Sequence, residues 1–118
     1  MATVVKRNFG SPDEEISPGR GKVAIIRAGD TTFKRVIFYP GWRWTEDIGP
    51  QADTELCPVP HYFVHISGQL HIKMEDGKEY EFGPGDVSVI PPGHDAWVDG
   101  SEPVVIIDQT PAEAPPSS

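Results

Sequence analysis

The sequence has a single cysteine, no long apolar run, and fewer basic than acidic residues. Cys57 alone cannot form the disulfide framework that staples many small secreted domains. No stretch approaches the roughly 18 consecutive apolar residues of a membrane-spanning helix. Lys and Arg number 10 against 18 Asp and Glu, which gives a formal net charge of −8. This balance argues against nucleic acid and membrane surfaces as partners, and we expect a cytoplasmic protein.

Glycine and proline, in contrast, are abundant. They contribute 12 and 13 of the 118 residues, about a fifth of the chain. Such usage indicates many tight turns, and therefore short strands rather than long helices. We find no convincing amphipathic helix, and β-branched or aromatic runs recur at residues 23–28, 32–39, 61–66, 69–74, 78–82, 87–90, 94–98 and 103–108. The pattern predicts an all-β protein, a sandwich or barrel.

The length of 118 residues fits one domain with irregular ends. Residues 1–21 mix charges, glycine and proline, which predicts an irregular arm in which Val4 and Val5 can form an added edge strand. Residues 22–109 form the predicted barrel. Residues 110–118 are rich in Pro, Ala and Ser and are predicted to be a disordered tail.

One hairpin is predicted in detail from residue alternation. Leu70, Ile72 and Met74 alternate with polar residues, which indicates a half-buried strand with His71 facing solvent. Asp76-Gly77 then predicts a type I′ turn, because this dipeptide readily adopts positive φ angles.

Two groups of residues carry a family resemblance. Residues 85–93 read Gly-Asp-Val-Ser-Val-Ile-Pro-Pro-Gly, which resembles the second motif of the cupin superfamily: Gly, five residues, Pro-x-Gly, two residues and a metal-binding His. The first motif of that family is Gly, five residues, His-x-His, three or four residues, Glu, six residues and Gly. Its spacing is matched by Gly49, Glu55, Cys57, His61 and Gly68. The resemblance implies a small jelly-roll (cupin) barrel with an inward-facing pocket.

The ligand positions depart from the family pattern. Glu55-x-Cys57 stands in place of His-x-His, and His61 stands in place of Glu. Ala96 occupies the position of the closing His, with His94 two residues earlier and therefore on the same strand face. Thiolate, imidazole and carboxylate groups suit Zn, Fe, Ni or Cu rather than Mg or Ca. We therefore predict a divalent transition metal held by Cys57, His61, His94 and Glu55.

Another interpretation of these positions is that the barrel has lost its metal. Cys57 is then a small buried hydrophobe, Glu55 a solvated charge at the rim, and His61 a hydrogen-bonded pocket residue. His94 can instead be an acid–base group, or part of a polar turn with Asp95. A nucleophilic pair of Cys57 and His61 is also conceivable, although no oxyanion-stabilising element can be named.

Further candidates concern the substrate. His65 lies four residues from His61 and shares its strand face, which makes it a candidate catalytic acid or base. Arg43 lies between Trp42 and Trp44, and with Trp97 these residues are predicted to bind a planar, anionic substrate by stacking and hydrogen bonding. The tryptophans are equally suited to filling the core and the barrel ends.

Together these features predict a barrel that binds one transition metal and a small organic acid or carbonyl compound. A redox metal would support dioxygenation, and zinc would support isomerisation. The alternatives are a metal-free sensor or carrier without catalysis, and metal-independent acid–base chemistry by His61 and Glu55. We also expect a homodimer, in which residues 4–9 add to a neighbour's sheet edge.

Overall fold

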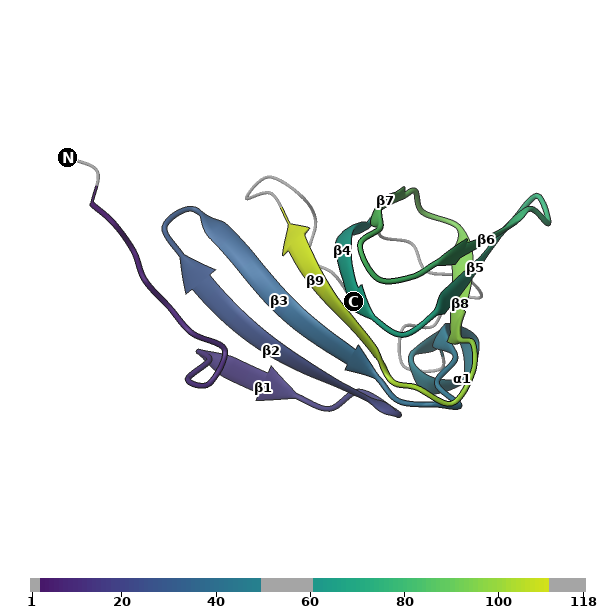
Figure 1. Cartoon of the computed structure of the whole chain (residues 1–118), viewed down its shortest axis with the longest axis horizontal. Coiled ribbons are helices and arrows are strands. Elements are labelled where there is room, and N and C mark those ends of the chain that lie inside the picture. The colour runs from purple at the N-terminus through teal and green to yellow at the C-terminus, as the bar shows by residue number, and fades with distance from the viewer. Residues whose placement is uncertain (1–2, 50–60, 111–118) are drawn as a thin grey trace.

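The computed structural model describes residues 3–49 and 61–110, and within them it is built almost entirely of strands (Figure 1). A six-stranded antiparallel sheet has the order β1-β2-β3-β9-β4-β7, and a three-stranded sheet has the order β6-β5-β8. The elements are β1 Glu14–Ile16, β2 Gly21–Ala28, β3 Thr31–Phe38, α1 Trp44–Asp47, β4 His61–Ser67, β5 Leu70–Met74, β6 Glu79–Phe82, β7 Val87–Ile90, β8 His94–Val98 and β9 Val104–Thr110. The all-β prediction is confirmed.

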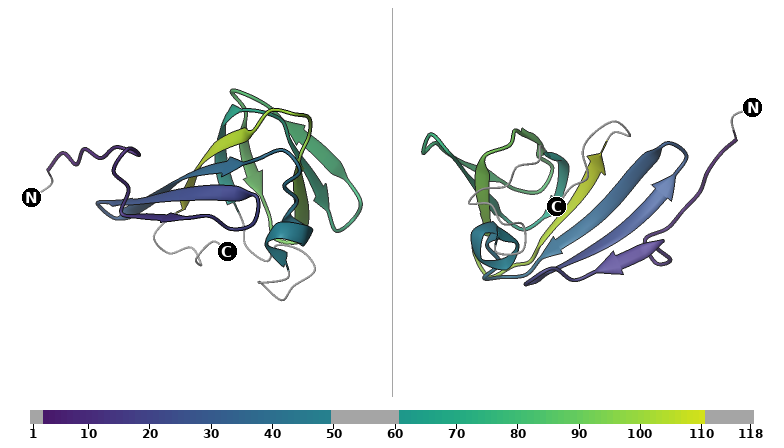
Figure 2. Two further views of the ribbon diagram at one scale, coloured as in Figure 1. Left: turned by 90° about the horizontal axis from the view of Figure 1, so that it is seen from below. Right: turned by 180° about the vertical axis from the view of Figure 1, so that it is seen from behind.

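The molecule is elongated because β1, β2, β3 and the segment before β1 extend beyond the barrel formed by the remaining strands (Figure 2). Its principal extents are 48 × 29 × 25 Å. No helix of the described residues is long and apolar enough to cross a bilayer.

The N-terminal arm differs from its prediction in where it forms a strand. Val4 and Val5 lie in no strand and are exposed, and the edge strand is β1, which pairs with β2. The residues before β1 are held on the sheet by Asp13, which accepts hydrogen bonds from the Arg7 side chain at 2.9 Å and the Arg27 backbone at 2.7 Å. Charged side chains therefore fix a segment that has little apolar surface to bury.

The inward and outward faces of β4 follow the two-residue period of a strand. Its buried residues are His61, Phe63 and His65, and its outward residues are Tyr62, Val64 and Ile66. The inward residues join a core that both sheets share: Val36, Phe38, Trp42, Trp44, Phe63, Leu70, Ile72, Ile90, Ala96, Val98, Val104 and Ile106. The strand faces thus determine which histidines point inward.

The β5–β6 hairpin has the predicted strands but a different turn. Leu70 and Ile72 are buried as expected. Met74 N donates to Lys78 O at 2.8 Å, and Gly77 N donates to Met74 O at 2.9 Å. Three residues, not two, therefore separate the closing pair, and the type I′ prediction is wrong. Gly77, with φ 89°, takes the left-handed position that such a longer turn needs.

The outer face of β4 and β7 is apolar and exposed. Tyr62 pairs with Val89 and Val64 with Val87, and all four side chains are exposed. A second copy of the chain is one way to cover this face, and the homodimer stays a prediction.

Candidate functional site

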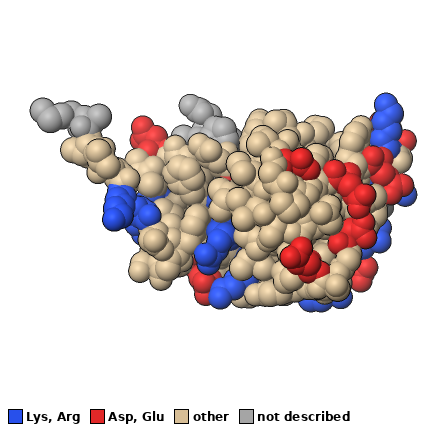
Figure 3. All heavy atoms as spheres, in the orientation of Figure 1, with Lys and Arg blue, Asp and Glu red and all other residues tan. Residues whose placement is uncertain are grey.

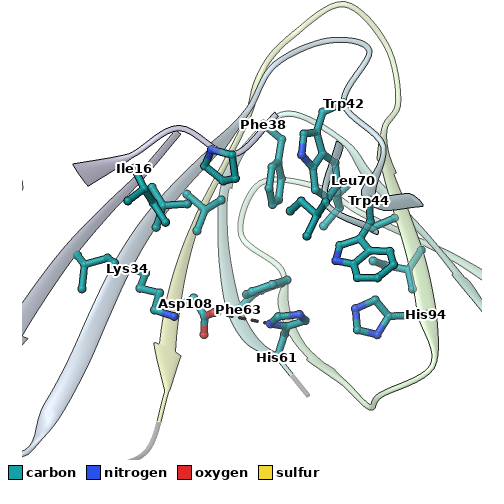
Figure 4. A pocket seen from close by; sticks show the side chains of 17 residues that line it. Ile16, Lys34, Phe38, Trp42, Trp44, His61, Phe63, Leu70, His94 and Asp108 are labelled. Carbon is teal, nitrogen blue, oxygen red and sulfur yellow. Dashed lines mark ion pairs between the residues drawn. The ribbon is translucent and has the colours of Figure 1, made fainter. Parts of the chain in front are cut away.

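A cavity of about 380 Å³ lies between the two sheets (Figure 4). Most of its wall is apolar, from residues of both sheets and α1: Ile16, Pro18, Val23, Ile25, Val36, Phe38, Trp42, Trp44, Ile48, Phe63, Leu70, Ile72 and Ala96. Among the described residues, the ionisable side chains that line it are Lys34, His61, His94 and Asp108. In Figure 4 these four form a row that faces Phe38, Trp42 and Leu70 on the other side. The cavity is therefore amphipathic, as small-molecule sites commonly are.

Two buried imidazoles meet inside the cavity from opposite sheets. His61 begins β4 in the large sheet, and His94 begins β8 in the small sheet. Their ring centroids are 5.2 Å apart, and the ring planes meet at 68°. His94 Nδ1 donates to the Pro91 carbonyl at 2.8 Å, which leaves the lone pair of a neutral ring on Nε2. A fixed tautomer of this kind is typical of metal-binding or acid–base histidines.

His61 is oriented by residues of its own sheet. Its ring stacks on Phe63, with centroids 4.9 Å apart and an interplanar angle of 20°. Its Nδ1 lies 3.7 Å from Asp108 Oδ2 on β9. Asp108 is only 3% exposed, so its carboxylate helps to fix the imidazole in a region of low dielectric constant.

Lys34 and Asp108 are pocket residues that the sequence interpretation missed. They are cross-strand partners on β3 and β9, and both line the cavity. Burial lowers the pKa of Lys34, and the Asp108 carboxylate offsets part of that shift. The sequence did contain a signal for this pair, since each is a charged residue within a β-branched run. Charged residues are rarely buried without a partner, so two of them in strands suggest an ion pair.

Trp42 and Trp44 line the cavity, as their predicted substrate role requires. Trp42 stacks on Phe38 with centroids 3.8 Å apart. The chain turns at Gly41, whose φ is 91°, and Trp42 N then donates to Tyr39 O at 2.9 Å. Trp44 begins α1 and is only 3% exposed. The short helix thus carries one wall of the cavity.

Arg43 and Trp97 do not line the cavity. The Arg43 guanidinium lies 4.4 Å from the centre of the Trp97 ring, and Arg43 Nε donates to Asp95 at 2.9 Å. Trp97 in turn stacks on His71, with centroids 4.5 Å apart. The structure therefore separates the predicted substrate residues into two pairs: Trp42 and Trp44 line the cavity, and Arg43 pairs with Trp97 across an isolated β-bridge outside it.

His65 shares the inward face of β4 but does not line the cavity. Its Nε2 is 2.8 Å from Ser88 Oγ, and its ring stacks on Phe82 with centroids 5.0 Å apart. Burial lowers the pKa of His65, against a smaller opposing effect of Asp86. The neighbours of His65 are those of a core histidine, and its catalytic role stays a prediction.

The buried His65 predicts an acid-sensitive fold. The folded protein binds a proton at His65 less readily than the unfolded chain, because the pKa of His65 is lowered on folding. The contribution of neutral His65 to the stability of the folded protein is complete above the unfolded pKa of about 6.5, and it is lost progressively at lower pH. We expect the free energy of unfolding, measured with urea, to fall from neutral pH to about pH 5. The fall should be smaller in His65→Gln, and equal falls in both proteins would contradict this assignment.

A second group of possible ligands lies on the outer face of the small sheet. Ligand atoms of His71, Glu81 and Asp99 all lie within 4.8 Å of one another, which makes this group a possible metal site. His71 Nε2 is also 2.6 Å from Glu79 Oε1. A hydrogen bond between the side chains of Glu81 and Asp99 raises the pKa of Glu81. Figure 3 shows acidic side chains gathered on this side of the molecule.

Glu55 and Cys57, two of the four predicted metal ligands, lie outside the described residues. The structure brings the other two, His61 and His94, together, as the prediction requires. Ala96 lines the cavity with His94, in agreement with the expected shared strand face. The full ligand set stays a prediction.

Comparison with known proteins defines the class to which this fold belongs. Residues 42–105, more than half of the chain, match the EutQ-like cupin domain. The chain therefore belongs to the EutQ-like cupin family, and the predicted cupin resemblance is confirmed. No curated protein matches the chain.

Solved structures agree with this assignment at the level of the fold. The polyketide cyclase RemF from Streptomyces resistomycificus is similar with a TM-score of 0.69 and 17% identity, over 97% of this chain and 83% of RemF. A Rhizobium leguminosarum protein of unknown function gives 0.66 and 20% identity, over 92% and 97% of the two chains. Lactobacillus farciminis oxalate decarboxylase gives 0.60 and 22% identity over 81% of this chain, which spans only 30% of that enzyme.

Proposed function

We propose that the cavity binds a small organic acid or carbonyl compound beside a single transition-metal ion. The observation that carries this proposal is the meeting of His61 and His94 across the cavity, with ring centroids 5.2 Å apart. Each imidazole comes from a different sheet, so the fold rather than local sequence holds the pair together. The apolar wall opposite them provides a surface for the organic part of a ligand.

The donor set fits an ion of the zinc, iron, nickel or copper type. His94 has its Nε2 lone pair available, because its Nδ1 proton is bound to Pro91 O. His61 and His94 would hold the ion, and Cys57 is the proposed third ligand, with Glu55 as the fourth. Imidazole and thiolate ligands of this kind favour borderline and soft metals over magnesium and calcium.

Such a metal would supply Lewis-acid polarisation of a carbonyl or carboxylate, or redox chemistry if it were iron or copper. The remaining residues of the cavity have separate tasks. Asp108 orients His61, and the aromatic wall excludes water and positions the organic body. These features suit an isomerase or a dioxygenase.

A metal-free binding protein is the second candidate, and one observation favours it. Among the described residues, the three-ligand group whose atoms lie close enough for one ion is His71, Glu81 and Asp99, on the outer face. His61 and His94 need a further ligand from outside that part of the chain. Without one, the cavity would serve as a sensor or carrier site.

Metal analysis of protein purified without an affinity tag tests the proposal. We expect near-stoichiometric Zn, Fe, Ni or Cu by plasma mass spectrometry in the wild type. Because each of these substitutions removes a proposed ligand, His61→Ala, His94→Ala and Cys57→Ala should each lose most of the bound metal.

His71→Ala is the matched control, because His71 belongs to the outer group and not to the cavity. It should retain the metal. Metal that persists in His61→Ala and His94→Ala but disappears in His71→Ala would place the ion at the outer group. Metal-free wild-type protein that still binds an organic acid would favour the sensor or carrier.

A further inference from the structure

The indole nitrogen of Trp44 is a buried hydrogen-bond donor without a partner. Among the described residues no acceptor lies within hydrogen-bond distance of Trp44 Nε1, although Trp44 is only 3% exposed. Figure 4 shows its indole beside His94, with the nitrogen on the edge nearer His61. Buried Trp N–H groups usually have a partner, and leaving one unsatisfied is costly.

We infer that Trp44 Nε1–H donates a hydrogen bond to an oxygen of the ligand bound in the cavity. This inference rests on the proposed function, that the cavity takes a small organic compound, and it specifies the class of that compound. The ligand has an apolar, flat body and, at one end, a carbonyl or carboxylate oxygen.

The two sides of the cavity fix the orientation of such a ligand. The donor of Trp44 lies on the side of the ionisable row formed by Lys34, Asp108, His61 and His94. Phe38, Trp42 and Leu70 lie on the opposite side and can pack against a ring. An oxygen on one end of an otherwise apolar molecule satisfies Trp44 while the apolar wall stays dry.

Trp42 provides an internal control. Its Nε1 is also buried without a partner among the described residues, but its ring is stacked on Phe38, away from His61 and His94. The inference therefore assigns the ligand oxygen to Trp44 and not to Trp42. Trp97 lies outside the cavity and gives a third indole signal that should not respond.

The test compares two probes of the same shape, acetophenone and α-methylstyrene, in which C=O replaces C=CH₂. Both are titrated into ¹⁵N-labelled protein, and the three tryptophan N–H signals are assigned from Trp→Phe variants. We expect acetophenone to move the Trp44 signal downfield, as hydrogen bonding does, while α-methylstyrene leaves it nearly unchanged. The ratio of the two affinities should fall about 5-fold in Trp44→Phe and stay constant in Trp42→Phe.

The possible results distinguish a failure of the Trp44 inference from a failure of the proposed function on which it rests. If both probes bind equally well and the Trp44 signal does not move downfield with acetophenone, the inference is wrong while ligand binding in the cavity stands. A downfield movement of the Trp42 signal in place of the Trp44 signal would also contradict the inference. If neither probe binds the wild type, the proposed function fails for this ligand class. The wild-type signals decide the matter even if Trp44→Phe does not fold.

Discussion

Replacing Gly68 by alanine is expected to lower the free energy of unfolding by about 3 kcal/mol. Gly68 has φ 79°, a left-handed conformation that L side chains rarely adopt. A Cβ at this position would lie 2.4 Å from Pro103 O and 2.7 Å from Val104 Cα, which are both backbone atoms. No side-chain rotation can relieve that contact, so the corner between β4 and β5 must move away from β9.

Gly77→Ala is the matched control for this prediction. Gly77 also has a positive φ, 89°, but a Cβ there would meet nothing within 4 Å. Only the backbone conformational cost remains, about 1–2 kcal/mol. In thermal denaturation Gly68→Ala should melt roughly 10–20 °C below the wild type, with a smaller shift for Gly77→Ala. Equal shifts in melting temperature would mean that the close contact with the backbone of Pro103 and Val104 adds no cost to Gly68→Ala.

Asp95→Ala is expected to cost about 2–4 kcal/mol and to loosen the wall that Trp44 forms. The Asp95 carboxylate is nearly buried and accepts hydrogen bonds from Arg43 Nε at 2.9 Å and from Ala96 N at 2.9 Å. It also accepts from Thr45 N at 3.2 Å and Thr45 Oγ1 at 3.3 Å. This side chain therefore fastens the start of α1 to β8, and its removal leaves several donors unsatisfied.

Two measurements check the Asp95 prediction. Urea unfolding gives the loss of stability, and tryptophan fluorescence should shift to longer wavelength in the native state as Trp44 becomes hydrated. Asp30→Ala, in the exposed turn between β2 and β3, is the control and should change neither stability by more than about 0.5 kcal/mol nor the emission maximum. A native Asp95→Ala protein with unchanged stability would show that other contacts hold α1.

The strands and their faces were predictable because alternation is a local property. The inward positions of His61 and His65, and of Leu70 and Ile72, follow from the two-residue period alone. The one-turn helix α1 was not predictable, because four residues have little helical preference of their own. It is held by tertiary contacts such as the hydrogen bonds to Asp95.

The site itself was only partly predictable, because its geometry depends on residues far apart in the sequence. The spacing of the motifs predicted His61 and His94 as metal ligands, but the distance between the two rings depends on how the two sheets face each other. Lys34 and Asp108 were missed because their pairing joins strands that are distant in the chain. Arg43 was grouped with Trp42 and Trp44 because it lies between them in the sequence, whereas the fold places it outside the cavity against the distant Trp97.

Anomalous X-ray diffraction from crystals of untagged protein tests the central claim most directly. The account predicts one anomalous peak at about 2.0–2.2 Å from imidazole nitrogens of both His61 and His94, in the cavity between the sheets. A peak at His71, Glu81 and Asp99 with none at the histidine pair would contradict it.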